Sequence, residues 1–586
     1  MLDTFRDLGP YLRRHRVAFL LGITLLVGNA FLATLIPIIP GRIIDGFQTG
    51  MTMPQLLSNL AMLVGLALAG ALIMVFVRRL ILGASWEIQF WIRHDIFKHF
   101  TVLDGNYFDN TRVGDLMARL TADLNAVRML IGVAIMMGCS TATMIGFTVY
   151  RMVSLSPSLA LLTIAVVPFI SLTFFILLRI IHRRYTRVQE QFSEVSAMAQ
   201  ENFSGIRVVK GFGIEHREMS KFAALNDEFV KRNLALTRVD GPLHPLMEFL
   251  FGLTVAMLVL VGGRLVLGVG SELTIGEFSS FILLFEGIQW PLVALGWIGN
   301  MAQRGSTSWG RLKEILASVP EVTDGPDTDY SLTEIKGAIE FRNVSVSFDG
   351  VKALDDVSFH IRAGESIGIT GRTGSGKTLV VQLITRLVNP DAGEILIDGI
   401  DYRRYPIEVI RRYIGLVPQE PFLFSDSIAE NIAYGVPEAS LDELEPRIRE
   451  AAGLAQLVND VDDFPLGFKT ALGERGVTLS GGQRQRTAIA RALIRDPRVL
   501  IFDDALSAVD TQTETLILSG LKHVQSSRTS VVVAHRISAF QNVDRIYVLE
   551  LGRIVEQGTH DELIALGGRY ADINERQQLE AEVEAA

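Results

Sequence analysis

The stretch "SIGITGRTGSGKTLVVQLITRLV" (Ser366–Val388) contains an apolar strand, a glycine-rich loop and an apolar helical run in direct succession. In that order, glycines turn backbone N–H groups toward phosphate oxygens at the start of a helix, where the helix dipole favours negative charge. We expect the Lys377 ammonium to neutralise the β- and γ-phosphates of a nucleotide and the Thr378 hydroxyl to bind Mg²⁺. The stretch therefore predicts a phosphate-binding loop, "GRTGSGKT" (Gly371–Thr378), within an α/β domain.

A second apolar strand, "RVLIFD", lies further along the chain and ends in Asp503. Its position fits the second Mg²⁺-binding carboxylate of P-loop nucleotide hydrolases. Other short β-rich runs, such as "AIEFRNVSVSF" and "SVVVAH", alternate with helical stretches. This alternation predicts a largely parallel core sheet with antiparallel additions.

The first half of the chain has a different pattern, with six runs that are uncharged or nearly so. They lie near 17–40, 56–77, 129–150, 157–178, 246–267 and 278–302, and they are long enough to span a bilayer. The loops after the second and fourth runs are long and basic, which places them and both termini in the cytoplasm. These loops contain few Gly or Pro residues and have helical apolar spacing, so we expect the membrane helices to continue far into the cytosol.

These patterns divide the chain into four parts. A transmembrane domain, 1–320, opens with an amphipathic basic lead-in helix that precedes the first span. A linker rich in Pro, Gly, Asp and Thr follows at 321–336, and the α/β domain occupies 337–576. The last part, 577–586, is an acidic tail whose "LEAEVEAA" is expected to be a solvated end without a mechanistic role.

Composition excludes several classes of protein. Hydrophobic residues make up 49% of the chain and charged residues 20%, a balance typical of membrane segments joined to a soluble part. The net charge of -9 gives no reason to expect nucleic acid as a partner. The single cysteine, Cys139, excludes an intramolecular disulfide framework. The compact chain and the absence of a targeting sequence favour a bacterial plasma (inner) membrane.

The stretch "LSGGQRQRTAIARAL" (Leu479–Leu493), just upstream of "RVLIFD", resembles the signature of the ATP-binding cassette (ABC). With the P-loop before it and six spans placed first, nearly the whole chain resembles a half-transporter of the ABC exporter type (type IV fold). The resemblance implies a multidomain protein, in which a six-helix α transmembrane domain with long cytoplasmic helical extensions precedes an α/β P-loop ABC nucleotide-binding domain. It also implies ATP and Mg²⁺ as cofactors.

The same resemblance assigns roles to individual residues. The ATP-binding residues of the chain's own pocket are Phe348, Gly371, Arg372, Thr373, Gly374, Ser375, Gly376, Lys377 and Thr378. The residues implied for Mg²⁺ are Thr378, Gln419 and Asp503, and those implied for catalysis are Asp504, His535 and Gln419. The residues directed at ATP held by the opposite subunit are Ser480, Gly481, Gly482, Gln483 and the D-loop residue Asp510. The residues implied for coupling to the membrane half are Glu474, Asp115 of the first cytoplasmic loop and Phe212 of the second.

Asp504 stands where this family usually carries a glutamate that polarises the attacking water. Aspartate keeps the charge but withdraws the carboxylate by about 1.5 Å. Misplacing a general base forfeits much of a contribution typically worth about 10²–10⁴-fold. ATP binding should survive this change, whereas hydrolysis should suffer. The chain therefore resembles the degenerate-site subunit of a heterodimeric multidrug or lipid exporter. Its complete signature would then serve a competent site on a partner chain. Degenerate subunits sometimes lose the switch histidine, whereas His535 is present, so a slow homodimer stays an alternative.

The sequence gives less information about the compound that is transported. Spans rich in Leu, Ile, Val, Phe and Met favour hydrophobic or amphipathic compounds, such as lipids or drug-like molecules. Glu286, inside the last span, either attracts a cationic cargo or holds a helix–helix hydrogen bond. The six spans exclude a soluble ATPase, and no extra segment points to a channel or a regulator. An importer with exporter architecture, for example for a siderophore, stays open because these motifs do not encode direction.

Overall fold

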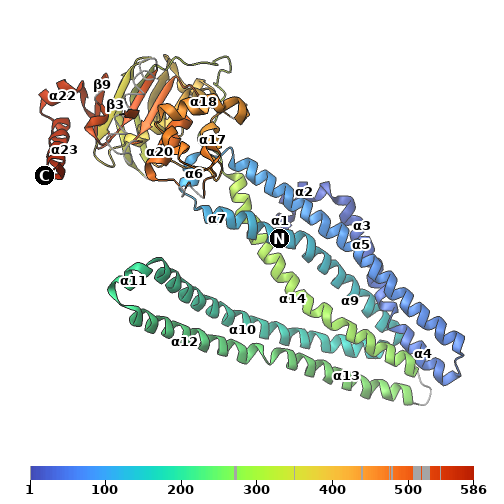
Figure 1. Cartoon of the computed structure of the whole chain (residues 1–586). Helices are drawn as coiled ribbons and strands as arrows, with labels where there is room; N and C mark the ends of the chain where they lie inside the picture. The colour runs from blue at the N-terminus through green and yellow to red at the C-terminus, as the bar shows by residue number, and fades with distance from the viewer. Residues whose placement is uncertain are drawn as a thin grey trace. The chain divides into compact units, whose positions relative to one another are not determined.

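The computed structural model describes the chain apart from residues 1, 269–272, 349, 437–439, 474–475, 477–478, 506–515, 518–527, 541–542 and 586. The chain divides into two compact units (Figure 1). Unit 1 comprises Met1–Thr101 and Val113–Ala317. Unit 2 comprises Val102–Arg112 and Ser318–Ala586, so a short piece of the first long loop belongs with the second half of the chain.

Every regular element described in unit 1 is a helix. Its helices are α1 (Leu2–Asp7), α2 (Gly9–Arg14), α3 (Arg16–Leu35), α4 (Ile38–Thr49), α5 (Met53–Phe100), α7 (Val113–Ala118), α8 (Leu124–Met129), α9 (Ile135–Leu155), α10 (Pro157–Ser204), α11 (Ile206–Phe212), α12 (Glu215–Asp240), α13 (Leu243–Leu267) and α14 (Ile275–Ala317). Two π-helical turns, η1 (Arg119–Asp123) and η2 (Leu130–Ala134), interrupt the run from α7 to α9.

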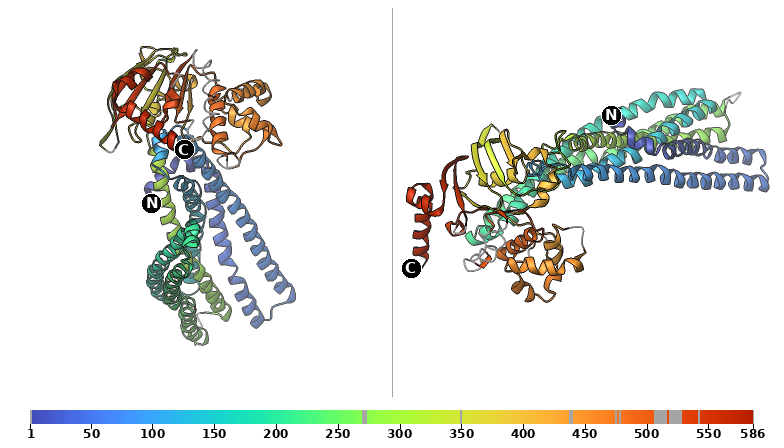
Figure 2. Two further views of the ribbon diagram at one scale, coloured as in Figure 1. Left: turned by 60° about the vertical axis from the view of Figure 1, so that its left-hand side comes forward. Right: turned by 90° about the horizontal axis from the view of Figure 1, so that it is seen from above.

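Six helical segments of unit 1 are long and apolar enough to cross a membrane. They are Arg16–Thr49, Met53–Phe100, Val113–Leu155, Pro157–Ser204, Glu215–Leu267 and Ile275–Ala317. Each has 34 to 53 residues, whereas the hydrocarbon core of a bilayer needs about 20. The prediction of six spans with long helical extensions is therefore confirmed. Figures 1 and 2 show α10 and α12 lying side by side, with α11 at the turn between them.

Local sequence explains where the two longest helices of unit 1 begin. At the start of α5, Thr52 and Gln55 form a reciprocal capping box, and the Thr52 N–H donates to Gln55 Oε1 at 3.0 Å. At the start of α10, the Ser156 hydroxyl accepts from the Leu159 N–H at 3.4 Å, and Pro157 follows at the first helical position. Both starts thus give partners to N–H groups that the helix itself cannot bond.

Unit 2 is an α/β body. Its strands are β1 (Ile339–Phe348), β2 (Val351–Ile361), β3 (Ser366–Gly371), β4 (Ala392–Ile397), β5 (Ile400–Asp401), β6 (Ile414–Val417), β7 (Val499–Asp503), β8 (Thr529–Val533), β9 (Arg545–Glu550) and β10 (Arg553–Gly558). Its helices are α6 (Gly105–Asp109), α15 (Lys377–Ile384), η3 (Tyr402–Arg404), α16 (Ile407–Tyr413), α17 (Ile428–Ala433), α18 (Leu441–Leu454), α19 (Val458–Asp462), η4 (Gly467–Lys469), α20 (Gly481–Leu493), η6 (Ile537–Phe540), α22 (His560–Leu566) and α23 (Arg569–Ala585).

The strands form two sheets. The larger has the order β10-β9-β3-β8-β7-β6, in which all neighbours pair in parallel except β10, which is antiparallel at one edge. The smaller is antiparallel, with the order β2-β1-β4-β5. The prediction of a largely parallel core sheet with antiparallel additions is confirmed.

The central strands are buried on both faces, and successive side chains belong to different apolar clusters. Ile501 and Val531 pack into the cluster on one face of the large sheet, whereas Leu500 and Val532 pack into the cluster on the other. Such strands read as unbroken apolar runs, which is why "VLIFD" and "SVVV" stand out in the sequence.

The segment between the last helix of unit 1 and β1, residues 318–338, contains no helix or strand. It nevertheless packs on unit 2. The Asp329 N–H donates to the Arg404 carbonyl at 2.8 Å, and Ile335 is buried. The Glu321 N–H donates to Asp104 Oδ2 at 2.6 Å, next to α6. Hydrogen bonds therefore hold the expected linker segment against the α/β body.

Candidate nucleotide-binding site

The candidate site lies along one edge of the large sheet. Strands β3, β8, β7 and β6 are neighbours in that order and run in parallel, so their carboxyl ends meet at the same edge. The P-loop follows β3, His535 follows β8, Asp503 ends β7, and Gln419 follows β6. Ligands of open α/β sheets bind at such an edge. The fold thus brings together four segments that are far apart in the sequence.

The backbone of the P-loop requires glycine at two positions in particular. Gly371 has φ 148°, and a Cβ there would lie 2.1 Å from the Leu549 carbonyl oxygen. Gly376 has φ 99°, and a Cβ there would lie 2.7 Å from the side chain of Leu354. Any larger residue at either position would be strained and would clash. These glycines let the loop turn tightly before α15 begins at Lys377.

Lys377 is buried inside the phosphate-binding loop, Gly371–Thr378. Its Nζ donates to the Gly371 carbonyl at 2.8 Å and to the Arg372 carbonyl at 3.0 Å. Burial lowers the pKa of Lys377, and the carboxylates of Asp504 and Asp503 oppose that shift. A nearby polyanion, such as a nucleotide phosphate, would stabilise the charged form of Lys377.

The Ser375 hydroxyl is a second polar group of the loop that a phosphate could bond. It is buried in the same loop and has no hydrogen-bond partner among the described residues. A buried hydroxyl without a partner costs free energy, and a phosphate oxygen would supply the missing acceptor. The loop therefore fits a nucleotide phosphate.

Asp503 and Thr378 form the pair expected to hold a divalent cation. The Thr378 hydroxyl donates to Asp503 Oδ1 at 3.4 Å, and Asp503 is buried. Burial is the largest effect on Asp503 and raises its pKa. The Thr378 hydrogen bond and the Lys377 charge act against this rise, whereas the Asp504 charge adds to it. Within the described ranges no three His, Cys, Asp or Glu residues cluster as metal ligands. A carboxylate and a hydroxyl fit Mg²⁺ bound together with phosphate oxygens and water.

Asp504 lies directly beyond the strand end. Its N–H donates to the Val533 carbonyl of β8 at 2.8 Å, and its Oδ2 accepts from Gln419 Nε2 at 3.3 Å. Its φ is 47°, in the left-handed region, which aspartate tolerates better than most residues. Gln419 and the Val533 carbonyl thus hold the side chain and the backbone of Asp504 next to Asp503.

The sequence analysis missed one residue at this edge, Gln577 of α23. Its Nε2 donates to the His535 carbonyl at 2.6 Å, and its Oε1 accepts from the Ile537 N–H at 2.9 Å. Gln577 lies two residues before the "LEAEVEAA" run that is expected to be a solvated end. The only signal was weak: Gln577 follows Tyr570 and Ile573 at helical spacing, on the face that packs against the core.

The signature residues lie at the start of α20, away from the P-loop contacts. Ser480 is the N-cap: its hydroxyl accepts from the Gln483 N–H at 3.2 Å, while the Ser480 N–H donates to Gln483 Oε1 at 2.9 Å. Gly481 and Gly482 form the first turn of the helix. Among the described residues, no hydrogen bond or ion pair joins these four to Gly371–Thr378.

The remaining predicted residues are scattered. Phe348 ends β1 with its side chain 45% exposed. Asp115 of α7 is exposed and pairs with Arg119 at 2.9 Å, and Phe212 ends α11 with its ring 79% exposed. Glu286 of α14 is exposed. Glu474 and Asp510 lie outside the described residues.

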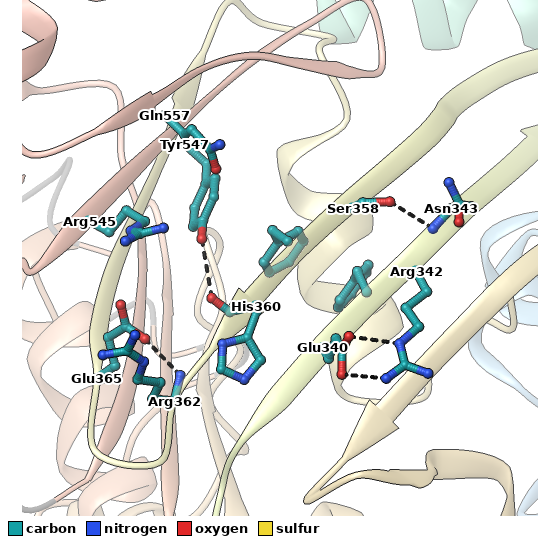
Figure 3. A pocket seen from close by; sticks show the side chains of 12 residues that line it. Glu340, Arg342, Asn343, Ser358, His360, Arg362, Glu365, Arg545, Tyr547 and Gln557 are labelled. Carbon is teal, nitrogen blue, oxygen red and sulfur yellow. Dashed lines mark hydrogen bonds and ion pairs between the residues drawn. The ribbon is translucent and has the colours of Figure 1, made fainter.

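A polar cavity of about 400 Å³ lies elsewhere in unit 2, between the small sheet and β9 (Figure 3). Its lining includes Arg362, Glu365 and Arg545, and the Tyr547 hydroxyl there donates to the His360 carbonyl at 3.2 Å. None of the predicted site residues lines it. The nucleotide site is therefore defined by the loop contacts at the sheet edge and not by this cavity.

Comparisons with known proteins agree with this geometry. The family model for the ABC transporter transmembrane region matches residues 19–292, and the ABC transporter model matches residues 354–507. YknU of Bacillus subtilis (strain 168), an uncharacterized ABC transporter ATP-binding protein, is 35% identical over 98% of this chain and 98% of its own length. This chain belongs to the ABC transporter family.

A second relative and a solved structure also match nearly the whole length of this chain. The multidrug resistance-like ATP-binding protein MdlA of Escherichia coli (strain K12) is 34% identical over 99% of this chain and 98% of its own length. The structure of a bacterial Atm1-family ABC exporter with ATP bound matches with a TM-score of 0.78 and 26% identity, over 97% of this chain and 98% of that one. The ABC transporter fold thus extends along both units.

Proposed function

We propose that this ABC transporter chain is one half of an ATP-driven exporter that pairs with a second half-transporter chain, and that its own pocket retains ATP and hydrolyses it slowly. The observation that carries this proposal is the carboxylate pair at the end of β7. Asp503 contacts Thr378 as a cation-binding residue should, whereas the next carboxylate is the short Asp504, which accepts from Gln419. The pocket keeps its binding groups and has a shortened general base.

Each part of the pocket then has a defined task. The P-loop N–H groups, Ser375 and Lys377 bind the phosphates, and the exposed ring of Phe348 stacks on adenine. Thr378, Asp503 and Gln419 would hold Mg²⁺, which when bound would neutralise charge that develops on the phosphates. His535, which follows β8 at the same edge, would face the γ-phosphate. Asp504 accepts a proton from the attacking water across a longer gap than glutamate would leave.

The signature turn serves the nucleotide of the opposite chain. Because Ser480 Oγ already accepts from the Gln483 N–H, its own O–H is available to donate to a phosphate oxygen. The start of the 13-residue α20 adds a positive dipole end and the N–H groups of Gly481 and Gly482. Ser480 to Gln483, with Asp510, would thus complete a competent site on the partner.

The test is hydrolysis by the full chain reconstituted alone and with a partner half-transporter. Alone, the chain should bind Mg·ATP and hydrolyse it at least tenfold more slowly than the pair does. Robust steady-state hydrolysis by the isolated chain, lost on Asp504→Asn, would instead favour a homodimer with two working sites. Uptake and efflux in oriented vesicles would decide between export and the importer alternative.

We propose hydrophobic or amphipathic cargo, with Glu286 on its path. Glu286 is exposed on α14, and no hydrogen bond or ion pair joins it to another described residue. Trp290 and Trp297 follow at spacings of one helical face, are 60% and 56% exposed, and contact each other edge to face at 5.4 Å. A carboxylate facing acyl chains is costly, so this face fits a water-accessible path better than the lipid.

Glu286→Gln is expected to lower transport of a cationic dye about tenfold and to leave a neutral dye of similar size within about twofold. Paired efflux assays in the same vesicles measure both dyes. Glu248→Gln is the matched control, because Glu248 is the acid in the preceding span and contacts His244 at 3.3 Å. Equal loss of both dyes would assign Glu286 to helix packing.

The location and the coupling residues complete the proposal. Both termini and the nucleotide-binding domain, 337–576, are placed in the cytoplasm of a bacterial cell, with the transmembrane domain, 1–320, in the plasma membrane. Asp115, Phe212 and Glu474 are proposed to pass motion between the two halves. The exposed Phe212 ring, at the tip of the α10–α12 pair, suits insertion into a partner surface.

A further inference from the structure

One amide connects the C-terminal helix to the two peptide units on either side of Arg536, the first of which carries the His535 carbonyl. Gln577 Nε2 donates to the His535 carbonyl at 2.6 Å, and Gln577 Oε1 accepts from the Ile537 N–H at 2.9 Å. The two ends of the amide meet groups of opposite hydrogen-bonding character, so only this orientation satisfies both. The side chain thus spans the turn between β8 and η6.

This turn lies outside the sheet ladder. Just before it, the Ala534 N–H donates to the Ile369 carbonyl of β3 at 3.3 Å. Beyond that point, the His535 carbonyl and the Ile537 N–H take their hydrogen bonds from Gln577. The backbone that carries the imidazole is therefore fixed from α23 as well as from β8.

Helix α23 is itself held firmly enough to act as a support. At its start, the Tyr570 N–H donates to Glu556 Oε2 at 3.0 Å, and the buried Tyr570 hydroxyl contacts His560 Nδ1 at 2.8 Å. Ile573 packs against the apolar core one turn later. Tyr570, Ile573 and Gln577 follow the i, i+3, i+7 spacing of one helical face.

The same helix also borders the P-loop. A small cavity of about 40 Å³ is lined by Gly371 and Arg372 on one side and by Asp572, Ile573 and Arg576 of α23 on the other. One helix thus lies against both the loop that is expected to hold the phosphates and the turn that carries His535.

We propose that Gln577 is a positioning residue for ATP hydrolysis, which fixes the backbone of His535 so that its imidazole keeps a constant distance from the γ-phosphate. This inference rests on the proposed role of His535 as the switch histidine. Gln577 acts through that backbone and contacts no reacting atom. Loss of the amide should therefore lower kcat and leave the KM for ATP almost unchanged.

The test uses the full chain carrying Asp504→Glu, so that its own pocket turns over measurably. Gln577→Met keeps the length of the side chain and removes both hydrogen bonds. We expect a fall in kcat of about three- to tenfold, a KM for ATP within about twofold, and faster amide hydrogen exchange in peptides covering 535–540. Gln577→Glu, which keeps only the bond from Ile537, should give an intermediate kcat.

Two controls separate positioning from general stability. Gln578→Met changes the exposed neighbour on α23 and should leave kcat and exchange unaltered. In a His535→Ala background, Gln577→Met should lower kcat no further, because both act through one group. An equal fall in that background, or unchanged kcat and exchange in Gln577→Met, would overturn the proposal. If the Asp504→Glu chain has no turnover even when a second chain supplies an intact signature, the role proposed for Asp504 fails, and hydrogen exchange in the natural chain still decides the role of Gln577.

Discussion

Asp504→Glu is expected to raise ATP hydrolysis by the isolated chain about tenfold to a hundredfold. The added methylene moves the carboxylate by about 1.5 Å toward the space beyond the P-loop, where the attacking water must lie. The groups that bind the phosphates and the cation are unchanged, so the KM for ATP should move by less than about threefold. Steady-state phosphate release measures the change.

The backbone conformation at position 504 limits how far Asp504→Glu can raise the rate of ATP hydrolysis. Asp504 has φ 47°, a conformation that costs glutamate more than aspartate, by up to about 1 kcal/mol. Asp504→Asn is the matched control, because asparagine also tolerates the left-handed region but cannot accept a proton. It should lower hydrolysis below that of the natural chain while Mg·ATP still binds. A chain in which Glu, Asp and Asn give equal rates would show that this carboxylate is not the base.

Gly481→Glu is expected to reduce the hydrolysis of any site that uses this chain's signature by more than a hundredfold. A carboxylate at the first residue of α20 would stand against a γ-phosphate and would cancel the favourable helix end. ATP binding to the chain's own P-loop should persist, because no described contact joins the two. Nucleotide binding and turnover, measured on the same preparation, separate these effects.

Mixing two inactive chains tests whether the signature acts across a dimer. One chain carries Asp504→Glu with Gly481→Glu, and the other carries Lys377→Met with an intact signature. In a homodimer each should be inactive alone, and equal coexpression should restore about a quarter of the Asp504→Glu rate, because half of the dimers have one competent site of two. Activity of the first chain by itself would show that its signature is not required.

Much of this fold could be predicted because its decisive features are local. Uninterrupted apolar runs identify both membrane spans and strands buried on two faces, and the P-loop needs glycine wherever its backbone leaves the range of other residues. Asp503 could be assigned because it ends such a strand. The approach of Thr378 and Lys377 to it then follows from parallel strands that share one edge.

Other features depend on contacts that no local pattern marks. Gln577 meets His535 only because α23 returns to the sheet edge, and its own neighbourhood in the sequence is that of an acidic tail. Asp504 has a left-handed backbone, and its N–H donates to the Val533 carbonyl of the adjacent strand, a contact between distant segments. The grouping of Val102–Arg112 with unit 2 depends on the contacts of Asp104 with a segment that lies 217 residues away.

The 48-residue helix α10 has a mechanical consequence. A helix of that length spans about 72 Å, so a tilt of about 5° at one end would carry the other end through roughly 6 Å. Because α12 runs beside it and α11 joins the two, the pair resists bending better than one rod would. We expect a small rotation applied at one end of this pair to appear at the other end as a displacement of several ångströms.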